Sequence, residues 1–98
     1  MNVVAHTEPA QAILATIRRR GIAALTESKA AESRMEASKA EKDWGMAKVR
    51  WQWSVANAAG AEELAKLYGE LTNDSGEDVY MAWRAECGYA DADDEDAD

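Results

Sequence analysis

The side chains of this chain that could do nucleophilic or metal chemistry are few and far apart. His6 is the only histidine and precedes the first expected helix, and Cys87 is the only cysteine, with no other Cys or His near it in sequence. A zinc site needs several such ligands, and a thiol nucleophile needs a general base within hydrogen-bond reach. We therefore expect no metal site and no cofactor, and we expect Cys87 to be a core residue. The sequence leaves open whether the fold brings His6 close to Cys87.

Carboxylates are abundant, above all in the last nine residues, ADADDEDAD. A solvated acidic tail does not raise a carboxyl pKa for acid–base work. The tail also departs from a calcium-binding loop, because the sixth position counted from Asp91 is Asp96, where the turn needs glycine. The chain has no glycine-rich phosphate loop. We therefore expect a protein that is not an enzyme.

Three of the four tryptophans fall in Trp44–Val55, WGMAKVRWQWSV, where Lys48 and Arg50 alternate with Trp51 and Trp53. Aromatic rings stack on bases and cations track phosphates, so this composition suits single-stranded nucleic acid. Packing in a core or an interface explains the same rings without a ligand. We favour that second interpretation and keep weak nucleic-acid binding as an alternative.

Charge is distributed unevenly along the chain. Residues 1–59 carry nine Lys/Arg against six Asp/Glu, whereas residues 60–98 carry two against thirteen. An acidic half repels nucleic acid and attracts basic protein surfaces, although the acidity could also serve solubility alone. The hypothesis is a partner-binding surface with Trp44 and Trp51 as aromatic anchors. Its predicted acidic residues are Glu77, Asp78, Glu86, Asp91, Asp93, Asp94, Glu95 and Asp96.

Four helical segments are predicted. The first runs from Pro9 to Arg20 and ends at Gly21, the second is a long central helix from residue 26 through the Trp segment, the third covers 58–71 after an Asn57 cap, and the fourth follows Ser75 and ends at Gly88. Within the Trp segment, alternation at period two is also typical of a strand over residues 46–56. We favour helix, because a lone strand has no partner to pair with. Gly45 could end the long helix or lie inside it.

The expected fold is therefore all-α, a small helical bundle with a long central helix and an acidic, flexible tail. Residues 1–89 would form one domain, and residues 90–98 would form the tail. Within the central helix, Ala30, Ala37, Trp44, Trp51 and Ala58 recur every seven residues, a seam that could receive another helix. One cysteine, the absence of a signal-like N-terminus and the lack of a long apolar window predict a soluble, cytoplasmic protein.

Two resemblances follow from these features. Trp44–Gly45, the run from Tyr89 to Asp93 and a length near 100 look something like the WXG100 secreted hairpins, although that family has one residue between Trp and Gly, and four helical segments do not suit a two-helix hairpin. Size, acidity and the lack of catalytic motifs resemble small acidic helical inhibitors of bacteriophages, the anti-CRISPR-like class. That resemblance implies blocking of a host complex that handles nucleic acid.

The leading hypothesis is thus a non-catalytic inhibitor that covers a basic surface of a host protein or nucleoprotein complex. The alternative is a structural subunit that self-assembles, as a homodimer for instance, through the central helix. The motivation for the alternative is that Trp44/Trp51/Val55 and Met46/Val49/Trp53 would lie on opposite faces of that helix. We expect the Trp44/Trp51 face to be the interface.

Overall fold

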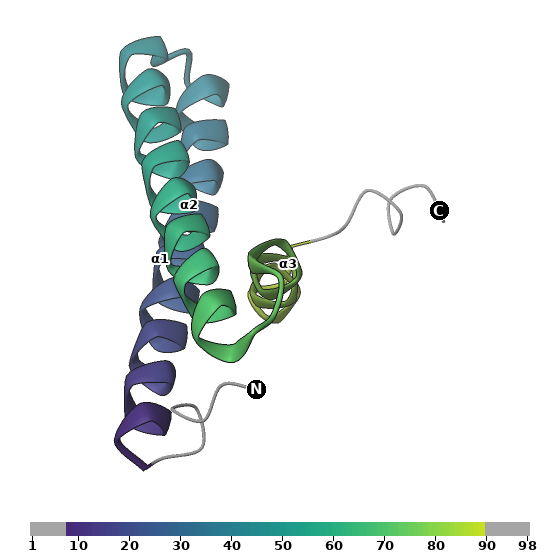
Figure 1. Ribbon diagram of the computed structural model, residues 1–98. Helices are drawn as coiled ribbons and strands as arrows, with labels where there is room; N and C mark the ends of the chain where they lie inside the picture. Colours follow the sequence, from purple (N-terminus) through teal and green to yellow (C-terminus); the bar gives the residue numbers. More distant parts are fainter. Residues whose placement is uncertain (1–7, 90–98) are drawn as a thin grey trace.

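The computed structural model describes residues 8–89, and within them the chain forms three α-helices and no strand (Figure 1). They are α1 (Glu8–Ala40), α2 (Trp44–Thr72) and α3 (Gly76–Glu86). The first two form a long antiparallel hairpin, and α3 packs beside its open half. The all-α bundle is confirmed, and the Trp segment is helical. None of the helices in residues 8–89 combines the length and apolar composition needed to cross a membrane.

The sequence predicts that the first helix ends at Gly21. In the structure, Gly21 lies buried in the middle of α1. A Cβ at this position would overlap ring carbons of Trp83 in α3. Glycine is therefore needed here because it lets the Trp83 ring lie directly on the α1 backbone. Arg18, Arg19 and Arg20 consequently lie inside the helix and do not cap its end.

The predicted long central helix is broken after residue 40, where the chain reverses direction. Lys42 has a left-handed φ of 61°, and the Asp43 N–H donates to the Ser38 carbonyl at 2.8 Å. This bonding pattern closes a helix end in the Schellman manner. Asp43 then caps α2, because its side chain accepts from the Met46 N–H at 3.2 Å. The Trp segment therefore opens the second helix.

The predicted boundary at Asn57 is also wrong. Asn57 lies inside α2, where its side-chain nitrogen donates to the Trp53 carbonyl, and the helix continues to Thr72. Its end is set by Asn73, whose φ of 59° is left-handed. The last helix begins as predicted: the Ser75 hydroxyl accepts from the Asp78 N–H. Gly88 follows the end of that helix with a φ of 83°.

The contact between α1 and α2 differs in its two halves. On each helix the buried residues are spaced by three, four or seven positions, so they form one continuous seam along the hairpin. In the open half the buried residues of α1 include Leu14, Ile17 and Leu25, and the last two share one core cluster with Val79 and Trp83 of α3. In the half near the turn, which we call the turn half (residues 28–57), the buried positions are Ser28, Ala31, Ser38, Ala47 and Ser54.

Hydrogen bonds accompany this small-residue packing in the turn half. The Ser28 hydroxyl donates to the Ser54 carbonyl at 2.9 Å and also lies 3.1 Å from the Ser54 hydroxyl. Nearer the turn, the Arg50 guanidinium donates to the Arg34 carbonyl and to the Ser38 hydroxyl at 3.0 and 2.8 Å. Small side chains let the two backbones approach closely, and as a consequence the large apolar side chains of this half face outward.

Candidate protein interface

The turn half exposes an unusual amount of aromatic surface. Trp44, Trp51 and Trp53 are 63%, 53% and 59% exposed, and Val49 and Val55 are about as open. Tryptophan is rarely left in water without a reason, because it buries the largest apolar area of any side chain. In the predicted bundle, with the Trp segment in its central helix, one of the two apolar faces of that segment would be buried against the other helices. The structure leaves both faces exposed, so the segment is surface and not core.

The exposed side chains of α2 divide between two sides of the hairpin. Eleven residues make three helical turns, so Trp51 projects in nearly the same direction as Glu62, and Val55 as Lys66. Glu62 and Lys66 line a groove with Gly76 and Glu77, which places α3 on that side. The same side of the hairpin therefore carries Trp44, Trp51 and Val55 in the turn half and α3 in the open half. We call it the α3 side. Met46, Val49 and Trp53 lie on the opposite side.

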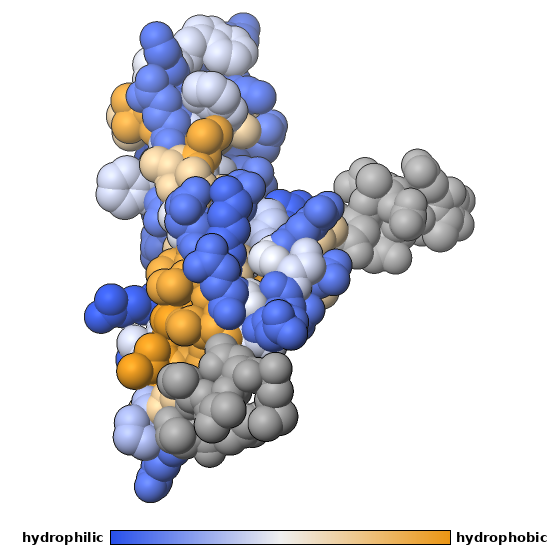
Figure 2. Space-filling model, in the orientation of Figure 1, coloured by the Kyte–Doolittle hydropathy of each residue, from blue (hydrophilic) through white to orange (hydrophobic). Residues whose placement is uncertain are grey.

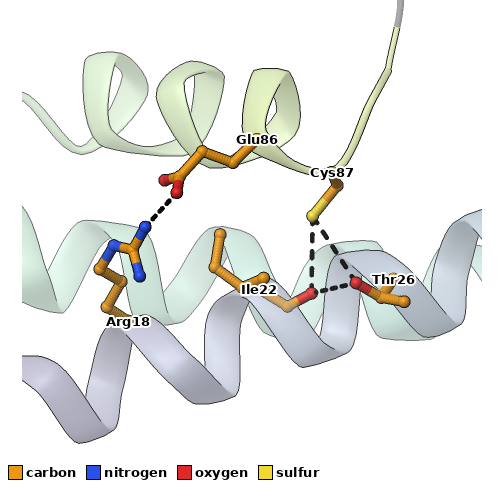
Figure 3. A network of polar contacts seen from close by, with 5 residues as sticks. All are labelled: Arg18, Ile22, Thr26, Glu86 and Cys87. Carbon is orange, nitrogen blue, oxygen red and sulfur yellow. Dashed lines mark hydrogen bonds and ion pairs between the residues drawn. The ribbon is translucent and has the colours of Figure 1, made fainter.

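The predicted acidic residues of the last helix have different surroundings. Glu77 and Asp78 are exposed in the first turn of α3, where the helix dipole favours carboxylates. Glu86 instead pairs with Arg18 of α1, and Figure 3 shows its carboxylate turned toward that guanidinium. Glu86 thus links α3 to the hairpin within the chain. The other predicted acids, Asp91, Asp93, Asp94, Glu95 and Asp96, lie outside the described residues.

Cys87 is half-buried where α3 meets α1. Its sulfur lies 3.6 Å from the Ile22 carbonyl and 3.8 Å from the Thr26 hydroxyl (Figure 3). These contacts suit a packed thiol, which agrees with the predicted core role. His6 lies outside the described residues, and within residues 8–89 no three Cys, His, Asp or Glu side chains are grouped to hold a metal ion.

The basic and aromatic residues of the Trp segment are not brought together on one surface. Arg50 turns inward, since its guanidinium bonds to α1 as described. Trp51 and Trp53 are two residues apart on a helix, about 200° around its axis. A single strand of nucleic acid could not stack on both rings while contacting Arg50. The geometry therefore gives no support to the nucleic-acid alternative.

Tyr89 closes the contact between α3 and the hairpin. Its hydroxyl donates to the Leu25 carbonyl at 3.3 Å, and its ring lies 4.4 Å from the Arg84 guanidinium carbon. Burial raises the pKa of the Tyr89 phenol above its ordinary value of 10, because loss of water disfavours the phenolate. Sequence reasoning missed this role, since nothing in the local pattern around Tyr89 indicates a contact with α1.

Trp44–Gly45 comes directly after the hairpin turn, at the start of α2. The objection that four segments do not suit a hairpin therefore no longer applies to the WXG100 resemblance. The missing residue between Trp and Gly still separates this chain from that pattern, and α3 packed on the hairpin is a further difference. Comparison of the chain with known proteins finds no matching family model, no similar curated protein and no similar solved structure.

Proposed function

We propose that this chain is a non-catalytic inhibitor that binds a basic protein or nucleoprotein surface through its α3 side. One observation carries the proposal: exposed Trp44 and Trp51 lie on the same side of the hairpin as α3, whose first turn carries exposed Glu77 and Asp78. Protein interfaces combine desolvated aromatic anchors with a polar rim. Stoichiometric blocking of a host complex, as in the anti-CRISPR-like class, is the activity such a surface could provide.

The aromatic anchors should dominate affinity, and the charges should set its salt dependence. A central Trp in an interface typically costs about 2–4 kcal/mol of binding energy when it is truncated. An exposed ion pair contributes about 1 kcal/mol or less and is screened by salt. Trp51→Ala should therefore weaken binding about 30- to 700-fold at any ionic strength. The double substitution Glu77→Gln/Asp78→Asn should weaken binding at low salt and change it little at high salt.

Site-specific photo-crosslinking tests this proposal. A benzophenone amino acid is placed at Trp51 or, as the matched control, at Trp53 on the opposite side, and the protein is mixed with lysate of the source cells at low salt. We expect position 51 to crosslink to a basic or nucleic-acid-binding protein and position 53 not to do so. Capture of no such protein from position 51, or equal capture from both positions, would refute the α3 side as the binding surface.

A further inference from the structure

A groove lies between α1 and α2 in the turn half, on the side of the hairpin away from α3. It has a volume of about 320 Å³ and is lined by Ala31 and Arg34 of α1 and by Val49, Arg50 and Trp53 of α2. Ala31 is buried, whereas Val49 and Trp53 are more than half exposed. In Figure 2, hydrophilic and hydrophobic residues alternate over the turn half, at the top, in contrast to the apolar patch lower on the hairpin. We call this hollow the arginine groove.

Arg50 is held in the arginine groove by neutral partners. One nitrogen of its guanidinium, Nη1, donates to the Arg34 carbonyl at 3.0 Å and to the Ser38 hydroxyl at 2.8 Å. Arg50 makes no ion pair within residues 8–89. In that range no buried side-chain nitrogen or oxygen lacks a hydrogen-bond partner, so the nitrogens that make no bond, Nε and Nη2, are accessible. The side chain is thus fixed in place while its other N–H groups stay available to a ligand.

Arg34 brings a second positive charge to the same groove from the facing helix. Its side chain is exposed, and like Arg50 it has no carboxylate partner among the described residues. No Asp or Glu in the described part of the chain lines the groove. Two cations on facing walls repel each other unless an anion lies between them. Guanidinium groups bind carboxylate and phosphate oxygens through paired hydrogen bonds, so the groove is suited to an oxyanion.

The apolar wall of the arginine groove selects among oxyanions. Val49 and the Trp53 ring lie beside the two guanidiniums, and covering them with an apolar group removes their surface from water. Nucleic acid gains affinity from the number of phosphates that are neutralised, and two arginines on a chain of net charge −8 neutralise few. A carboxylate next to an aromatic or aliphatic side chain matches the cations and the apolar wall together.

Two simpler occupants match only part of the groove. Residues 90–98 of the chain itself carry six carboxylates, which suit the arginines, but no apolar residue larger than alanine to cover Trp53. A free apolar acid would remain largely in water, because small-molecule sites bury most of their ligand and this wall is more than half exposed. A peptide can place two side chains in the groove while its main chain runs along the open surface of the hairpin.

We infer that the arginine groove binds an acidic segment of a partner protein, in which a carboxylate adjoins an aromatic or aliphatic side chain. The carboxylate lies between Arg34 and Arg50, and its apolar neighbour packs on Trp53 and Val49. This charge preference is opposite to that proposed for the α3 side. The two sides of the hairpin therefore select surfaces of opposite charge.

Nuclear magnetic resonance of the full, isotope-labelled chain tests the inference with short peptides. The probe is the acetylated and amidated tripeptide glutamate–phenylalanine–glutamate. One control has glutamines in place of its glutamates, and a second has alanine in place of its phenylalanine. The probe should shift the Trp53 indole signal but not the Trp51 signal, with a dissociation constant of about 1 mM or below. Each control should bind about fivefold more weakly or worse, since it lacks either the charge or the apolar group.

Matched variants separate the arginine groove from the rest of the surface. Arg34→Gln should weaken probe binding about fivefold, as expected for the loss of one exposed ion pair. Arg19→Gln, which changes another exposed arginine of α1, should have no effect. Trp53→Ala should weaken binding by a similar factor and Trp51→Ala should not, as followed at the backbone amide of Val49. Circular dichroism should show unchanged helix content for each variant.

Four results would overturn the inference. Three of them are a Trp53 signal that the probe does not move, equal binding of the probe and its glutamine control, and equal effects of Arg34→Gln and Arg19→Gln. The fourth is tighter binding of phenylacetate than of the tripeptide, because the groove would then be a site for a free acid. These measurements use the purified chain and acidic probes, so their outcome is independent of the photo-crosslinking test of the α3 side.

Discussion

At the scale of the residue, the contact of Gly21 with Trp83 fixes how α3 sits on the hairpin. Sequence reasoning interpreted Gly21 as a helix stop, which is the commonest use of glycine after a basic run. The residue that explains it is 62 positions away along the chain. Local pattern could not connect the two.

The substitution Gly21→Ala should destabilise the protein. Alanine gains about 1 kcal/mol of helix propensity, but its Cβ displaces the Trp83 ring, and overpacking of this kind costs about 1–3 kcal/mol. The same change at Gly60 meets no neighbouring atom and should raise the free energy of unfolding by about 1 kcal/mol. Chemical denaturation of both variants measures the difference. Equal effects at the two glycines would contradict the packing described for Trp83.

Tyr89 should make stability fall at alkaline pH. Its pKa is raised in the folded chain, so between pH 10 and that raised value the unfolded chain has lost a proton that the folded chain keeps. The Tyr89 contribution to stability is therefore constant below pH 10 and decreases above it. Urea denaturation between pH 8 and about 11 should show a steeper loss for the wild type than for Tyr89→Phe. Parallel curves would indicate that the phenol ionises equally in both states.

At the scale of the element, the hairpin turn is the largest departure from the sequence prediction. Residues 26–43 are rich in the strong helix formers Ala, Glu, Lys and Arg, and neither glycine nor proline marks the reversal. The left-handed residue is Lys42, a type that rarely adopts this conformation. A usable signal existed in Asp43, since aspartate before an apolar run is a good N-cap. The seven-residue seam continued across this position and suggested one helix where there are two.

The two halves of the hairpin should differ in local stability. The open half buries large side chains of α1 and α3 and partly buries Leu64, Tyr68 and Leu71 of α2, whereas the turn half buries only serine and alanine along its seam. Less buried apolar area means that local opening costs less free energy. In dilute solution, amide hydrogen exchange should be faster for residues 31–57 than for residues 14–25 and 61–69. Uniform protection along α1 and α2 would show that the seam contributes as much as the core.

At the scale of the whole molecule, the turn half exposes large apolar side chains on two sides of the hairpin. The all-α class followed directly from composition and periodicity. The sequence also separated the two faces of the Trp segment correctly, but it assumed that one of them was core. Only the fold shows that small residues fill the seam, that α1 covers neither face, and that α3 covers one side of the hairpin but not the other.

This distribution of tryptophans also gives the molecule two separate optical reporters. Trp83 is 3% exposed and packs edge-on against Tyr68 at 5.6 Å, while the other three indoles face solvent. A collisional quencher such as acrylamide should suppress most of the intrinsic emission of the folded chain, and Trp83→Phe should remove the resistant part. Emission from the turn half then reports docking, whereas the resistant emission reports whether α3 remains on the hairpin. Binding and unfolding can thus be followed separately in one unlabelled sample.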